Sequence, residues 1–189
     1  GLKCTLAEID PALSALAAGN ARLNLLDDRV DALTLDVGDK DALVASGLKS
    51  GSVDRVVMNP PFHDATRQNL SPDPRRRLAH AAEPGLLPRW IASAAWLLKP
   101  QGVLTLIWRA DGLAGVQSAL AAEFGAIAVL PVYPRPDAPA IRVLVRAVKS
   151  GSGAAVTMPG LTLNDRLGRP SVAAEAVLRG GGALALAKS

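Results

Sequence analysis

Apolar and polar positions alternate between strand-like and helix-like segments along most of the chain. Short apolar runs that end in polar residues predict strands, and apolar residues three or four positions apart predict helices between them. The predicted strands cover residues 2–9, 30–35, 53–58, 103–108, 126–132 and 140–148. The predicted helices cover residues 11–24, 41–46, 88–98 and 112–124. This alternation indicates an α/β fold with a mostly parallel sheet that carries helices on both faces.

Two segments interrupt this alternation. Residues 62–84 contain prolines and polar residues without a helical or strand period, which predicts a long irregular loop, and such loops in compact domains are usually functional or disordered. The tail from Ser150 is rich in glycine and has room for an edge strand over residues 155–163 and a short helix over 171–178. We therefore expect one domain over residues 1–150, with residues 151–189 as a tail that packs on it.

Polar side chains stand at the ends of three predicted strands. Glu8, Asp36 and Asn59 each lie at the carboxyl end of a different strand. Ligands of open parallel sheets bind outside these ends. The sequence therefore predicts that the three side chains face one crevice.

Asn59-Pro60-Pro61-Phe62 follows the third strand directly. A residue before proline is extended and proline fixes its own φ, so two successive prolines hold a rigid corner. Proline has no N–H, and the corner therefore offers the Asn59 side-chain oxygen and the Pro60 carbonyl oxygen as acceptors beside an aromatic ring. A planar amine or carboxamide could donate both its hydrogens to these oxygens, while Phe62 stacks on an attached base.

Composition narrows the chemistry further. The chain has 189 residues, 49% of them hydrophobic, which suits one domain with a buried core. Its single cysteine excludes an internal disulfide, its two histidines leave few metal ligands, and we predict no metal site. These counts fit a reduced, cytoplasmic compartment. The net charge of +4 is compatible with nucleic acid without requiring it.

Residues 56–62, Val-Val-Met-Asn-Pro-Pro-Phe, resemble the signature of Rossmann-like, S-adenosylmethionine-dependent methyltransferases that act on exocyclic nitrogens. Residues 6–11 and 20–24 resemble the second strand and helix of that family, and residues 97–102 resemble the turn before its fifth strand. Residues 142–145 and 175–180 are similar to the bacterial subgroup that methylates adenine N6 in a valine tRNA. The resemblance implies a class I methyltransferase sheet, mostly parallel with an antiparallel final strand.

The resemblance also implies roles for individual residues. Asn59, Pro60, Pro61 and Phe62 would be the catalytic corner. Glu8 would accept hydrogen bonds from the ribose hydroxyls of S-adenosylmethionine, and Ile9 would pack on its adenine. Asp36 would accept from the adenine amino group, with Val37 beside the ring. The first strand of the family and its glycine-rich turn are absent from this sequence, so we expect a segment upstream of Gly1.

An adenine must leave its stack to reach such a pocket, which costs least in a loop or a single strand. The resemblance implies that the substrate is RNA, and a tRNA in particular. The phosphates would be met by arginines of the irregular segment, namely Arg67, Arg75, Arg76 and Arg77. Arg109 and Arg135, also near strand ends, are weaker candidates. Three alternatives stay open: methylation of a glutamine side chain in a protein, a non-catalytic nucleic-acid-binding domain, and, ranked last, a nucleotide-binding oxidoreductase.

Overall fold

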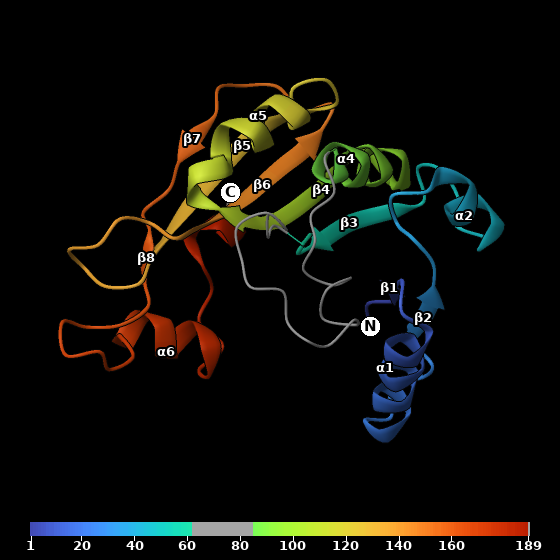
Figure 1. The fold of residues 1–189 in the computed structure, drawn as a ribbon, viewed down its shortest axis with the longest axis horizontal. Helices are drawn as coiled ribbons and strands as arrows, with labels where there is room; N and C mark the ends of the chain where they lie inside the picture. The colour runs from blue at the N-terminus through green and yellow to red at the C-terminus, as the bar shows by residue number, and fades with distance from the viewer. Residues whose placement is uncertain (62–84, 189) are drawn as a thin grey trace, which may run out of the picture. The chain divides into compact units, whose positions relative to one another are not determined.

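The computed structural model of the chain describes residues 1–61 and 85–188, which form two compact units, Gly1–Ser52 and Val53–Ser189 (Figure 1). The first unit contains β1 (Cys4–Glu8), α1 (Pro11–Leu23), β2 (Val30–Thr34) and α2 (Lys40–Ala45). The second contains six strands and most of the helices. The predicted division into residues 1–150 and a tail stays a prediction.

In the first unit, β1 and β2 pair in parallel, with Cys4 opposite Val30 and Glu8 opposite Thr34. Helix α1 connects the two strands and begins where the sequence predicts. The Asp10 carboxylate accepts a hydrogen bond from the Ala12 N–H at 2.8 Å, and Pro11 occupies the first helical position, where its missing N–H costs nothing. Glu8 and Thr34, the last residues of β1 and β2, therefore lie side by side at the carboxyl end of this two-stranded sheet.

The second unit is built on a sheet with the strand order β3-β4-β6-β5-β7, and the short β8 also pairs with β5. The long strands are β3 (Val53–Met58), β4 (Leu98–Arg109), β5 (Phe124–Tyr133) and β6 (Arg142–Lys149). The short strands β7 (Val156–Thr157) and β8 (Leu161–Thr162) lie along β5. β3 and β4 are parallel, whereas β6 is antiparallel to both β4 and β5.

Helices and the tail cover different faces of this sheet. α4 (Leu86–Leu97) and α5 (Leu113–Leu120) pack on one face, where alternate residues of the strands are buried, among them Leu104, Leu106 and Val145. On the other face, Leu130 and Val132 pack with Leu186 from the last turn, η2 (Ala185–Lys188). The helix α6 (Val172–Leu178) belongs to the same returning tail, and the turn η1 (Ala110–Gly112) joins β4 to α5.

The fold class is confirmed: a mixed α/β protein with mostly parallel pairing and one antiparallel long strand. Some element ends differ from the prediction. α4 begins at Leu86 rather than at Pro88, and β4 begins at Leu98 rather than at Val103. The predicted turn at residues 100–102 lies inside β4 as a bulge, because Val53 pairs with Leu98 and Arg55 already pairs with Val103. Within that bulge Gln101 adopts a φ of 64°.

The described part of the chain holds no helix of the length and apolar character that crossing a bilayer requires. In residues 1–61 and 85–188, no three side chains of His, Cys, Asp or Glu gather in a way that would hold a metal ion.

Candidate active site

The Asn59-Pro60-Pro61 corner follows β3 directly and continues the strand's alternation of exposed and buried residues. Met58 and Pro60 are buried, the Pro60 side chain almost completely, while Val57 and Asn59 are exposed. Alternate residues of a strand face opposite sides of the sheet, so Pro60 anchors the corner on the helix-covered face and Asn59 stands on the other. Pro61 is half-buried.

Neither acceptor of this corner is used by the described fold. Among residues 1–61 and 85–188, no donor binds the Asn59 side-chain oxygen or the Pro60 carbonyl oxygen. Both acceptors are therefore available to a ligand as far as this part of the chain is concerned. Phe62, the fourth residue of the predicted catalytic corner, lies outside the described residues.

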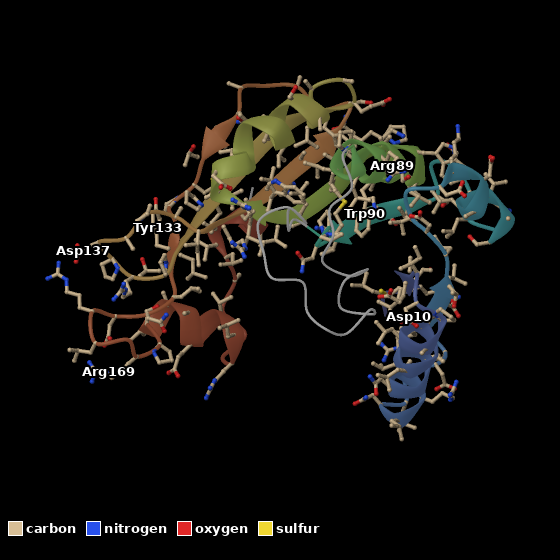
Figure 2. All side chains as sticks on the ribbon, viewed as in Figure 1. Asp10, Arg89, Trp90, Tyr133, Asp137 and Arg169 are labelled. Atoms are coloured by element: carbon tan, nitrogen blue, oxygen red, sulfur yellow. The ribbon has the colours of Figure 1, made fainter. Side chains whose placement is uncertain are left out.

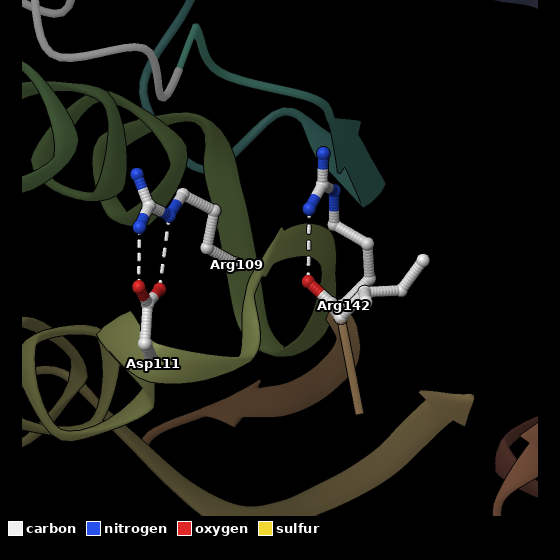
Figure 3. A network of polar contacts seen from close by, with 4 residues as sticks. Arg109, Asp111 and Arg142 are labelled. Carbon is white, nitrogen blue, oxygen red and sulfur yellow. Dashed lines mark hydrogen bonds and ion pairs between the residues drawn. The ribbon is translucent and has the colours of Figure 1, made fainter. Parts of the chain in front are cut away.

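Beside this corner, β4 ends in a charged group that Figure 3 shows from close by. The Arg109 guanidinium binds both carboxylate oxygens of Asp111, with Nε 2.9 Å from Oδ1 and Nη2 on Oδ2. These bonds, together with the positive charges of Arg109 and Arg142, lower the pKa of the Asp111 carboxyl below its usual value. Arg142 begins β6 and lies directly opposite Arg109 in the ladder.

The backbone of Ile141 joins the strand ends around this group. Its carbonyl oxygen accepts from the Arg142 Nη1 at 2.8 Å and from the Ala110 N–H at 3.3 Å. Its own N–H donates to the Val132 carbonyl at 2.9 Å. The end of β4, the start of β6 and the end of β5 are thereby fixed to one another.

In the first unit, two half-buried carboxylates stand at neighbouring strand ends. Glu8 Oε1 accepts from the Asp10 N–H at 3.0 Å, and Asp36 Oδ1 accepts from the Gly38 N–H at 2.7 Å. The Leu35 N–H binds the Glu8 carbonyl at 3.0 Å, so Asp36 follows directly after the last contact between the two strands. Each carboxylate keeps its second oxygen unbound within the described residues.

An apolar side chain follows each of these carboxylates. Ile9 is 56% exposed and Val37 is half-buried. Two anionic acceptors with aliphatic neighbours suit a nucleoside, whose hydroxyl and amino groups donate and whose ring is apolar on its faces. The four residues therefore fit the adenosine half of S-adenosylmethionine.

The sequence placed Asn59 in one crevice with Glu8 and Asp36, and this convergence stays a prediction because Asn59 belongs to the other unit. Arg67, Arg75, Arg76 and Arg77 lie outside the described residues. Sequence reasoning missed Asp111 and the facing of Arg109 and Arg142. The only local sequence signal for this charged group was that charged residues follow directly after an apolar strand.

Comparison with known proteins decides the family. A family model described as "Methyltransferase small domain" matches residues 3–132. The chain belongs to this family. The resemblance read from residues 56–62 is thereby confirmed.

Among curated relatives, the chain is similar to proteins named tRNA1(Val) (adenine(37)-N6)-methyltransferase from two strains of Porphyromonas gingivalis. It is 34% identical to each over 106 residues, which are 56% of this chain and 40% of the relative. The matched segment thus spans well under half the length of these methyltransferases.

Among solved structures, one described as a predicted O-methyltransferase from Agrobacterium tumefaciens matches with a TM-score of 0.77 and 24% identity, over 95% of this chain and 78% of that one. A putative rRNA-methylase from Clostridium thermocellum matches with a TM-score of 0.53 and 15% identity, over 78% and 75%. These likenesses show the fold of the chain, which is that of class I methyltransferases. The methyltransferase family to which the chain belongs implies S-adenosylmethionine as the cofactor.

Proposed function

We propose that the protein is an S-adenosylmethionine-dependent N-methyltransferase that methylates an exocyclic amino group, and that this group is N6 of an adenine in RNA, most simply in a tRNA. One observation carries the proposal. The exposed Asn59 and the buried Pro60 present two oxygens at the carboxyl end of β3, and the described fold uses neither of them. The names of the Porphyromonas relatives support the choice of adenine N6 and of tRNA.

The corner performs the chemistry by placement. The Asn59 side-chain oxygen and the Pro60 carbonyl oxygen each accept one amino hydrogen, which turns the nitrogen lone pair away from the protein oxygens and toward the methyl donor. When bound, S-adenosylmethionine supplies an electrophilic methyl group on a sulfonium. The same two oxygens stabilise the positive charge that develops on the nitrogen. The protonated product is acidic and loses its proton without a strong base in the protein.

Rigidity of the corner matters for this mechanism. Pro60 is fixed on the helix-covered face and both prolines have restricted φ, so the two acceptors are set before the amine arrives. Orientation fixed in advance lowers the entropic part of the barrier. A flexible loop with the same oxygens would lose that advantage.

The first unit would hold the cofactor. We propose that Glu8 accepts from the ribose hydroxyls and Asp36 from the adenine amino group, with Ile9 and Val37 against the ring. Arg67, Arg75, Arg76 and Arg77 would then bind phosphates of the RNA around the target. The site of action is expected to be the cytoplasm.

Asn59→Ala is the direct test of the corner. It removes one acceptor, so we expect transfer of labelled methyl from S-adenosylmethionine into total RNA to fall by at least about a hundredfold, as when one transition-state hydrogen bond is lost elsewhere. Cofactor affinity, measured by calorimetry, should stay nearly unchanged. Asn20→Ala is the matched control, because Asn20 is an exposed asparagine on α1.

The recipient of the label separates the alternatives. Normal turnover by the Asn59→Ala variant would show that the Asn59 side-chain oxygen does not hold the amino group, and the proposed mechanism would be wrong. Label in the protein fraction instead of the RNA fraction would point to a glutamine carboxamide, which the same two oxygens can hold. Absence of cofactor binding by the full protein would leave a non-catalytic nucleic-acid-binding domain.

A further inference from the structure

The loop between β5 and β6 lies at the edge of the sheet that carries Asn59. β3, β4 and β5 run in the same direction, because β6 is antiparallel to both β4 and β5. Their carboxyl ends therefore share one edge, and ligands of open α/β sheets bind outside that edge. Tyr133 ends β5, and residues 134–140, which we call the proline loop, follow it directly.

The proline loop has a fixed backbone. The Ile141 N–H donates to the Val132 carbonyl at 2.9 Å and closes the loop. Arg135 stands between two prolines, and a residue before proline is extended. The Ala138 N–H binds the Arg135 carbonyl at 3.3 Å, which makes a turn with proline in its second position, where turns favour it. The position of Arg135 is therefore set before any ligand arrives.

A turn of the tail holds the proline loop in place. The Pro134 carbonyl accepts from both the backbone N–H and the side-chain Nδ2 of Asn164, at 3.2 Å each. Arg166 binds the Asp137 carboxylate, with Nε 3.0 Å from Oδ2. Figure 2 shows Asp137 and Arg169 on two loops at the same end of the second unit. We call residues 164–170 the tail turn.

The tail turn is itself tied together by one carboxylate. Asp165 accepts from the Leu167 N–H at 2.8 Å and from the Arg169 N–H at 3.0 Å. It also pairs with the Arg169 guanidinium, with Nη2 2.7 Å from Oδ2. The tail turn is therefore a fixed support for the proline loop.

Arg135 differs in its charge pairing from the other arginines of the proline loop and the tail turn. Arg166 and Arg169 each bind a carboxylate, as described above. Arg135 is exposed, and in residues 1–61 and 85–188 no acceptor binds its guanidinium. The two ion pairs neutralise the charges beside it, so Arg135 presents the excess positive charge of the two turns.

The register of the sheet gives the separation between Asn59 and this loop. Continued past Met58, the ladders place Asn59 in the row of Leu130, three strands away on β5. With strands about 4.8 Å apart and a rise of about 3.3 Å per residue, the Cα atoms of Asn59 and Tyr133 are roughly 17 Å apart. This separation is longer than one nucleotide, so a strand of RNA can reach the loop only with a nucleotide that flanks the target.

We propose that Arg135 binds a backbone phosphate of a nucleotide flanking the adenine that Asn59 holds, and that Asn164 and Arg166 are positioning residues for this contact. The inference rests on the proposed function and gives the tail a part in RNA binding. A guanidinium suits phosphate because its planar fork donates two parallel hydrogen bonds. Contacts to phosphates fix the register of a nucleic acid on a protein, which here would bring the target base to Asn59.

The salt dependence of RNA binding tests Arg135. Each phosphate contact to a single strand contributes about 0.7 to the slope of log affinity against log salt concentration. For the full protein and an RNA hairpin with adenines in its loop, we expect Arg135→Gln to reduce the slope by about 0.7. Arg135→Lys keeps the charge and should leave the slope nearly unchanged. Arg55→Gln is the matched control, because Arg55 is exposed on β3 four residues before Asn59 and its loss should not alter the slope.

A double-mutant cycle tests the tail turn. Arg135→Gln should weaken the affinity for the hairpin about tenfold, the loss expected for a charge-assisted hydrogen bond. Asn164→Ala removes the side-chain bond to Pro134 without changing any charge. In the Asn164→Ala variant, Arg135→Gln should therefore cost less than about fivefold, because both residues act on one contact. In the control variant Asn20→Ala, on α1, the cost should stay about tenfold.

The outcomes distinguish this inference from the function on which it rests. If the unaltered protein transfers labelled methyl to no RNA, the proposed function is wrong. If it methylates RNA and Arg135→Gln has the same salt slope as Arg55→Gln, Arg135 is a solvated surface residue and the inference is overturned. If the slope changes but the effects of Asn164→Ala and Arg135→Gln on affinity simply add, the tail turn only stabilises the fold and its positioning role is refuted.

Discussion

Asp111 is a side chain whose titration reports on its surroundings. Hydrogen bonds from Arg109, with the charges of Arg109 and Arg142, lower the pKa of its carboxyl below 3.8. The ion pair therefore contributes its full stabilisation above about pH 3.8 and loses it as the pH falls through the lowered pKa. A carbon NMR titration of the Asp111 carboxyl should show a midpoint below 3.8.

Two variants locate the cause of this shift. Arg109→Gln removes the bonded guanidinium, so the pKa of Asp111 should move back toward 3.8. Arg55→Gln removes a distant charge and should leave the titration as it was. An unchanged midpoint in Arg109→Gln would contradict the bonded geometry of Figure 3. The pair is partly exposed, so its effect on stability should stay below about 1 kcal/mol.

At the scale of elements, the docking of β8 on β5 depends on a glycine that is required for space. A Cβ on Gly160 would collide with the Tyr133 ring and would lie 2.8 Å from the Pro131 carbonyl oxygen. This carbonyl belongs to the backbone of β5 and cannot move aside. Figure 2 shows Tyr133 at the end of the second unit where Asp137 and Arg169 also lie.

Gly160→Ala should therefore lower the free energy of unfolding by about 1–3 kcal/mol, the usual cost of overpacking, in urea denaturation. Amide exchange should accelerate at Met158 and Leu163, whose N–H groups bind β5 at 2.8 Å each. Gly115→Ala is the control: it lies inside α5 with nothing within 4 Å of the added methyl group. That change should stabilise the protein by up to about 1 kcal/mol, and equal behaviour of the two variants would refute the packing argument.

The start of a helix or strand could be predicted where the residues that determine it are adjacent in the sequence. Asp10 and Pro11 mark the start of α1 because the capping oxygen and the missing N–H act on neighbouring residues. The start of β4 was not predictable in this way. Pro100 and Gly102 are typical of a turn, yet the structure has a bulge inside a strand at this point, because Leu98 pairs with Val53 from a distant part of the chain.

The same distinction holds for the candidate site. The Asn59 corner could be predicted, since its acceptors and its rigidity come from adjacent residues. The facing of Arg109 and Arg142 could not, because it depends on β6 running in reverse beside β4, which no local pattern specifies.

At the scale of the whole molecule, the tail is a structural cover for one face of the second unit. Leu186 is 5% exposed and packs with Leu130 and Val132 of β5. Leu186→Asp would place a charge without a partner in this cluster, which is costly. We expect β7 and β8 to lose their protection from amide exchange, while α4 on the opposite face keeps its own.

Ala187→Asp is the control for this change, because Ala187 is the next residue and is exposed. It should leave the exchange pattern unaltered. Retained protection of Met158 and Leu163 in Leu186→Asp would show that the tail is held by its backbone bonds to β5 rather than by its apolar contacts.

The strand order has a consequence for the way the protein is made. β5 has no ladder with β4; the two are joined only through β6, which is synthesised after both. A ribosome adds about 5–20 residues per second. β5 therefore leaves the ribosomal exit tunnel before β6 and stays unpaired until Lys149, the last residue of β6, has emerged. During that interval its apolar residues are exposed, and a chain that stops short of β6 would be left with a sheet split in two.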